Sequence, residues 1–193
     1  MDQIIKTKKI NGYTKKQAVN LAFKIGFETE ASKTNCAQAT FHSISSVLGV
    51  KNPQIFKSLY SIAGGGASST CGSCGAFSGA LVAFGFFFGR TYEQFQNSKL
   101  DAKSDKLAIK FYKKFVRRFN TVICMEIHKK VFGRTFNFSN KKDIREFEKL
   151  GAYTIKCPAV VGLSSAWAIE ILWDYIPRDI DITKVIDIED VAF

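Results

Sequence analysis

The sequence lacks the segments that direct a protein out of the cytoplasm or into a membrane. Its N-terminus is polar and basic, without the apolar core of roughly 7–15 residues that a secretory signal contains. One long uncharged stretch runs from Ser58 to Gly89, but its apolar part (76–88) has only about 13 residues, whereas a membrane span needs about 20. We therefore expect a cytoplasmic protein with no membrane span, and a buried helix at 76–88.

Several cofactor motifs are also missing. Cys74 is followed by Gly75 and not by histidine, so the chain has no motif for covalent attachment of a c-type haem. A second CxxC is absent, which argues against a zinc ribbon, and no βαβ pattern surrounds the single CxxC as it would in a thioredoxin-like protein. The glycine-rich loop 64–70 lacks the Lys-Ser/Thr of a P-loop.

Acidic residues are scarce, and the formal net charge is +11. The excess lies mainly in residues 99–149, which carry about fifteen basic and six acidic side chains, while residues 150–193 have an acidic excess. Such a surface can attract an acidic partner. Because no nucleic-acid reader motif is recognisable, we read most of this charge as a solvated helix face and expect an acidic redox partner.

What the sequence does have is helical periodicity, from Thr14 to about Tyr175. The expected fold class is mainly α, a compact multi-helix domain around a central glycine-rich apolar helix at 74–89. Residues 4–10 are β-like and basic and residues 179–190 are acidic and branched, so the two ends allow a small β element, a homodimer arm or a solvated tail. The expected division is an N-terminal basic extension (1–13), a helical domain (14–177) and an acidic C-terminal extension (178–193).

Capping side chains, proline at the first helical position and glycine beyond the last one indicate where the helices begin and end. Thr14 with Gln17 has the pattern of a capping box. The expected helix starts are Thr14, Asn35, Asn52, Ser73, Asp101, Thr121, Ser139 or Asn140, and Pro158.

Five cysteines in a cytoplasmic chain favour metal binding or redox chemistry over structural disulfides. Four of them lie at expected helix starts, where free amides and the helix dipole should lower the thiol pKa; these are Cys36, Cys71, Cys74 and Cys157. The Cys71–Cys74 pair is a redox dithiol or half of a metal site. Cys124 and His128 share a helix face at a spacing that can bind metal, although a surface position is the commoner one for such a histidine; His42 should have no ligand role.

The ordered motifs Asn35-Cys36-Ala37-Gln38, Gly64-Gly65-Gly66, Cys74-Gly75-Ala76-Phe77-Ser78-Gly79-Ala80, Cys124 and Lys156-Cys157-Pro158 resemble the C_GCAxxG_C_C family of redox-active proteins. The resemblance covers about residues 15–173, and its most specific piece is the segment that begins at Cys74. It implies a mainly helical fold and makes Cys36, Cys74, Cys124 and Cys157 the four family cysteines, with Cys71 an addition. A related domain occurs in split-Soret cytochromes, where the cysteines are thought to hold an iron–sulfur cluster.

Three functions follow. The first is a redox protein for electron transfer with an iron–sulfur cluster on Cys36, Cys74, Cys124 and Cys157, the usual set of four thiolates. The second is a thiol–disulfide protein whose catalytic pair is Cys71 and Cys74. The third is a structural zinc-binding module that uses the same thiolates without redox chemistry.

Overall fold

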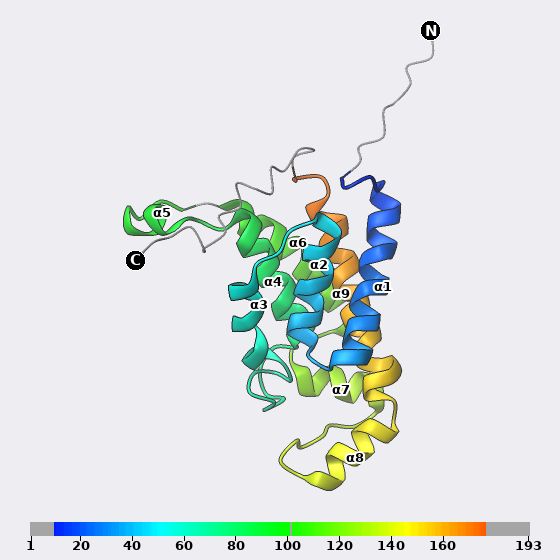
Figure 1. Ribbon diagram of the computed structural model, residues 1–193. Helices are drawn as coiled ribbons and strands as arrows, with labels where there is room; N and C mark the ends of the chain where they lie inside the picture. Colours follow the sequence, from blue (N-terminus) through cyan, green and yellow to red (C-terminus); the bar gives the residue numbers. More distant parts are fainter. Residues whose placement is uncertain (1–9, 101, 177–193) are drawn as a thin grey trace.

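The protein is a bundle of helices in the computed structural model, which describes residues 10–100 and 102–176 (Figure 1). Every regular element in these two ranges is helical, which confirms the predicted fold class. The longer helices are α1 (Lys15–Lys33), α2 (Cys36–Leu48), α4 (Gly75–Phe88), α6 (Ala102–Phe119) and α9 (Cys157–Leu172). The shorter ones are α3 (Pro53–Ser58), α5 (Tyr92–Gln96), α7 (Cys124–Phe132), α8 (Lys141–Lys149), the 3-10 turn Tyr60–Ile62 and the π-helical turn Ala152–Lys156.

Local capping explains where the first three helices begin. Thr14 accepts the amide of Gln17 and forms the predicted capping box, while the side chains of Asn35 and Asn52 cap α2 and α3. Pro53 occupies the first turn of α3, where its missing N–H leaves no hydrogen bond unmade. These starts agree with the sequence.

Three other expected helix starts shift by a few residues. Helix α7 begins at Cys124 instead of Thr121, because the Thr121 hydroxyl accepts the amide of Ile123 and forms a turn there. Helix α4 begins at Gly75. Helix α9 begins at Cys157, since a π-helical turn leads directly into it.

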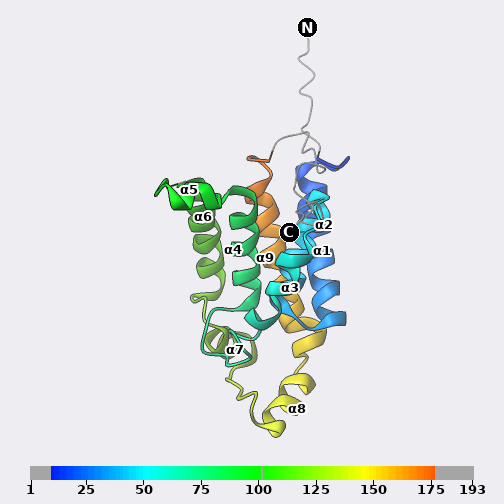
Figure 2. The same ribbon diagram turned by 60° about the vertical axis from the view of Figure 1, so that its left-hand side comes forward.

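Helices α1 and α9 pack closely side by side through small residues. A Cβ on Gly26 of α1 would lie closer than 3.0 Å to the Ser165 hydroxyl of α9, and one on Gly162 of α9 would press on Phe23. Helix α9 also contacts α2, α4 and α6, so that α4 and α9 together form the centre of the bundle (Figure 2).

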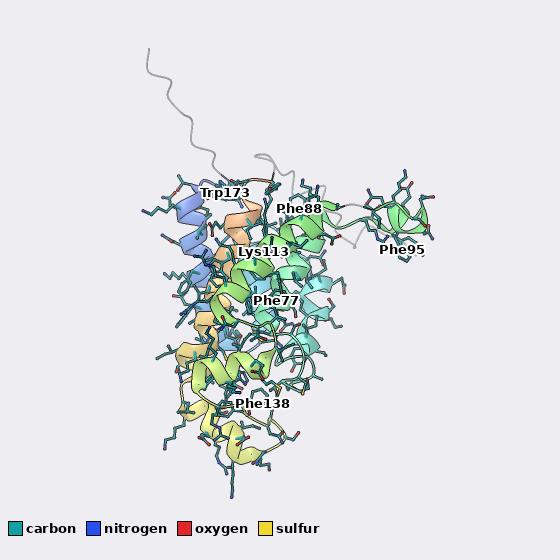
Figure 3. The ribbon with its side chains drawn as sticks, turned by 180° about the vertical axis from the view of Figure 1, so that it is seen from behind. Phe77, Phe88, Phe95, Lys113, Phe138 and Trp173 are labelled. Carbon is teal, nitrogen blue, oxygen red and sulfur yellow. The ribbon has the colours of Figure 1, made fainter. Side chains whose placement is uncertain are left out.

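The contact between α4 and α6 is made mainly by aromatic side chains. Helix α6 buries Leu107, Phe111, Phe115 and Phe119 along one stripe, as its spacing of apolar residues predicts. Phe77 of α4 lies between Phe111 and Phe115, with ring centroids 5.5 and 5.1 Å away. Figure 3 shows Phe77 in the middle of the bundle and Lys113 on the outer side of α6.

One helical run would be long and apolar enough to cross a membrane. The run Ala152–Leu172 has 21 residues and contains an 18-residue window with a mean hydropathy of 1.4, of which 56% is buried inside the bundle. Packing against α1, α2, α4 and α6 is what the core helix of a bundle requires, so this run is weak evidence for a span. The predicted terminal β element lies outside the described residues.

Candidate functional site

Four cysteines line one cavity of about 280 Å³. Cys36 is the first residue of α2, Cys124 the first of α7 and Cys157 the first of α9, while Cys74 is the residue that caps α4. At the lower end of the bundle in Figure 1, where α7 lies across the ends of the long helices, three helix N-termini therefore meet the junction between the π-helical turn and α9. Their role as ligands stays a prediction.

A short backbone pairing holds two of these cysteines together. The amide of Cys74 donates to the carbonyl of Val122 at 2.7 Å, and the amide of Cys124 donates to the carbonyl of Gly72 at 2.9 Å. Ser73 and Ile123 form an isolated antiparallel bridge between these bonds. Cys74 and Cys124, although fifty residues apart in the sequence, are therefore fixed relative to one another by main-chain hydrogen bonds.

Glycines allow the backbone of α4 to lie directly on the start of α2. A Cβ on Gly75 would come closer than 3.0 Å to the Cys36 sulfur, and one on Gly79 would come equally close to the carbonyl oxygen of Ala37. The close contact between α4 and α2 thus explains why glycine stands at these two positions. These glycines let the Cys36 sulfur reach the residue next to Cys74.

The loop between η1 and α4 has an unusual backbone. Gly64, Gly65 and Gly66 adopt positive φ, as glycine readily does. Ala67, Ser68 and Thr70 also do so, with φ of 48°, 55° and 62°, a conformation that is strained for residues with a side chain. The loop lies close to the cavity, because a Cβ on Gly65 would lie 3.0 Å from the Cβ of Cys124.

Cys71 does not share the cavity. Its side chain is exposed, and its thiol donates to the carbonyl oxygen of Ser69 at 3.3 Å. Cys74, by contrast, is only 7% exposed and faces the cavity. The two cysteines of the CxxC therefore lie in different surroundings.

The cavity raises thiol pKa values, contrary to the expected effect of helix N-termini. A hydrogen bond with Cys74, followed by burial, raises the pKa of Cys36 well above its usual value, and burial raises that of Cys124 to about 12. Burial, then the nearby Glu30, Cys36 and Cys124, raises the pKa of Cys157. Removal from water and mutual repulsion among several thiolates outweigh the helix dipoles here, so these thiols stay protonated unless a cation binds beside them.

Glu30 is a cavity residue that the sequence analysis missed. It lies near the end of α1, is 3% exposed, and one of its carboxylate oxygens has no hydrogen-bond partner. Burial raises its pKa to about 7, although the amide of Asn35 donates to it. A signal exists in the sequence, because Glu30 continues a stripe of buried small residues at four-residue spacing: Ala18, Ala22 and Gly26.

The surface position expected for His128 was wrong. The imidazole is 4% exposed, its Nε2 lies 3.6 Å from the Cys124 sulfur, and its Nδ1 has no partner. Burial lowers its pKa to about 4, so the ring is neutral at pH 7. His42, for which no ligand role was expected, is exposed on α2 and faces Phe56 away from the cavity.

An aromatic cluster closes the cavity beside His128. Four phenylalanine rings lie within 6 Å of the imidazole: Phe132, Phe136, Phe138 and Phe147. Phe138 marks this cluster at the lower end of the molecule in Figure 3, next to α8. The sequence analysis did not single out these rings, because they gather from α7, α8 and the connection between them.

The described residues contain no preformed site for a metal ion. Within the described part of the chain, no three His, Cys, Asp or Glu side chains are arranged around one metal position.

The chain belongs to the C_GCAxxG_C_C family, whose model matches residues 34–171 and is described as "Putative redox-active protein (C_GCAxxG_C_C)". This confirms the resemblance seen in the sequence. No curated protein matches the chain. No solved structure matches it either.

Proposed function

We propose that this member of a redox-active family carries electrons by means of an iron–sulfur cluster held by Cys36, Cys74, Cys124 and Cys157. The observation that supports the proposal most directly is that four cysteines from four different helices or their caps line one cavity. Four cysteine thiolates are the usual ligands of [2Fe–2S] and [4Fe–4S] clusters. When bound, such a cluster supplies one-electron transfer.

The raised thiol pKa values in the cavity support binding of a cation there. Burial and mutual repulsion keep the thiols protonated, so only a bound cation makes thiolates favourable there. The N-termini of α2, α4 and α7 lie at Cys36, Cys74 and Cys124, and their partial positive charge stabilises an anionic centre once it has formed. The amide of Gly64 also donates a hydrogen bond to Cys36.

The residues around the sulfurs have separate tasks. Phe138 and Phe147 keep water from one side of the cavity. His128, neutral and 3.6 Å from Cys124, can donate a hydrogen bond to that sulfur, and such bonds are among the factors that set a cluster's reduction potential. The basic excess of the chain, +11, suits an acidic redox partner.

Anaerobic purification tests the proposal. The expected product is coloured and contains iron and acid-labile sulfide in similar amounts, and serine at any of the four cavity cysteines removes most of both. Cys71→Ser is the matched control and should keep the cluster, since Cys71 lies outside the cavity. A colourless, metal-free protein after such handling contradicts the proposal, and one bound zinc favours the structural module instead.

A further inference from the structure

The sequence suggests the CxxC as the dithiol of this protein, but the tertiary contacts bring a different pair together. Cys71 is exposed and its thiol turns to the carbonyl of Ser69. The Cys36 thiol, at the start of the neighbouring helix, lies against the residue that follows Cys74, and both cysteines line the same cavity. We propose that Cys36 and Cys74 form a reversible redox disulfide in the metal-free protein, and that small-molecule disulfides such as glutathione disulfide are its oxidants.

The packing of α2 on α4 supports this pairing. Gly75 has no side chain, and a Cβ there would come closer than 3.0 Å to the Cys36 sulfur, so this sulfur lies directly against the residue that follows Cys74. The close contact of Gly79 with the Ala37 carbonyl holds the two helices at this distance. Helix packing therefore places the Cys36 sulfur next to Cys74 at the start of α4, whereas the Cys71 thiol is held by a hydrogen bond to the carbonyl of Ser69.

The reaction balances in two steps. Cys36 is the more exposed of the pair, and the small fraction of it that is thiolate attacks one sulfur of glutathione disulfide, forming a mixed disulfide. The glutathione thiolate released in this step takes up the proton that Cys36 has lost. Cys74 then attacks the Cys36 sulfur, forming the Cys36–Cys74 bond and releasing the second glutathione. The two cysteines lose two electrons and two protons, and two glutathione molecules receive them.

This activity does not depend on the proposed cluster, because it concerns the metal-free chain. It transfers two electrons at once and uses only two of the four cavity cysteines. A metal bound by Cys36 and Cys74 would prevent it, so cluster occupancy and disulfide formation exclude one another.

The experiment is disulfide mapping of the metal-free, full-length protein. The folded chain is equilibrated anaerobically in glutathione buffers, free thiols are blocked with N-ethylmaleimide, and the peptides are identified by mass spectrometry. We expect Cys36–Cys74 to exceed Cys71–Cys74 by roughly tenfold or more in the folded chain, and the reverse order in guanidinium, where short loops close most readily. Far-UV circular dichroism verifies that the metal-free chain is folded.

Two variants sharpen the result. Cys71→Ser should form the same disulfide at the same glutathione ratio as the natural chain, whereas Cys36→Ser should form none within the cavity. A folded chain in which Cys71–Cys74 predominates, or which forms only mixed disulfides with glutathione, overturns the inference. Neither outcome would affect the iron analysis, so this proposal and the cluster proposal can fail separately.

Discussion

The middle of the bundle and its cysteine end are built in different ways. In the middle, most buried side chains are apolar, apart from a few serine and threonine hydroxyls, and Phe84, Phe111 and Phe115 are fully buried among rings and aliphatic groups. At the cysteine end, burial includes a carboxylate, an imidazole and several thiols. Three buried side-chain polar atoms lack a hydrogen-bond partner in the described residues, and those of Glu30 and His128 line the cavity.

The two regions differ in what they contribute to the stability of the fold. An apolar core gains free energy from every buried ring, whereas unpaired polar atoms and residues such as Ala67 and Thr70 at positive φ each reduce stability. Unfavourable features that gather at one place are typical of functional sites. The family's redox activity therefore belongs most naturally to the cysteine end.

The largest effect should come from the middle of the bundle. Phe84→Ala removes a ring with no exposed surface and should lower the free energy of unfolding by about 3–5 kcal/mol, measured by urea denaturation. Phe95→Ala is the matched control, because Phe95 is 56% exposed on α5, which projects from the bundle in Figure 1. That variant should change stability by less than about 0.5 kcal/mol. Equal losses in both would contradict the difference in packing.

Protonation should affect only the cysteine end. The pKa of Glu30 is about 7 in the folded chain against 4.5 as its ordinary value, so the folded state binds this proton more tightly and stability is lost as pH rises between the two. For His128 the folded pKa is about 4 against 6.5, so stability is lost as pH falls through that range. Titration of each group changes the free energy of unfolding by about 3 kcal/mol. The two pH dependences have opposite signs and nearly cancel between about pH 4.5 and 6.5.

Single variants of the metal-free protein separate these slopes. Glu30→Gln should become more stable as pH rises through that interval, because only His128 still titrates. His128→Leu should become less stable over the same interval, because only Glu30 still titrates. Urea denaturation at a series of pH values measures both, and parallel profiles for the two variants would disprove the assignment.

A smaller effect is expected where α4 lies on α2. Gly75→Ala places a methyl group against the Cys36 sulfur and should lower the free energy of unfolding by about 1–3 kcal/mol. On the same helix, a Cβ at Gly85 would meet nothing within 4 Å, so Gly85→Ala should raise stability by roughly 0.5–1 kcal/mol. Thermal or urea unfolding should therefore show that Gly75→Ala lowers the stability and that Gly85→Ala raises it.

The smallest effect should come from the cysteine outside the cavity. Cys71→Ser changes an exposed thiol and should alter stability by less than about 0.5 kcal/mol. Cys74→Ser places a hydroxyl at a site that is 7% exposed and should destabilise the metal-free chain by about 1–3 kcal/mol. Urea unfolding of the two variants side by side tests whether the CxxC cysteines differ as their surroundings do.

Much of the fold could be predicted from local patterns. The caps at Thr14, Asn35 and Asn52 and the apolar stripe of α6 are properties of neighbouring residues, so the helices they define were found nearly in register. The candidate cysteines were found by type and order. The thiol pKa values of Cys36 and Cys157 were predicted in the wrong direction, because the helix dipole is visible in the sequence and the depth of burial is not.

By itself, the sequence determined that the chain is helical, where most helices begin, and that its cysteines follow the order of a redox-active family. Only the tertiary structure decided that Cys36, Cys74, Cys124 and Cys157 share a cavity while Cys71 faces solvent, and that Glu30 and His128 are buried beside them. Capping and periodicity act within a few residues along the chain. Burial and side-chain proximity arise from segments far apart in sequence that meet only when the bundle is packed.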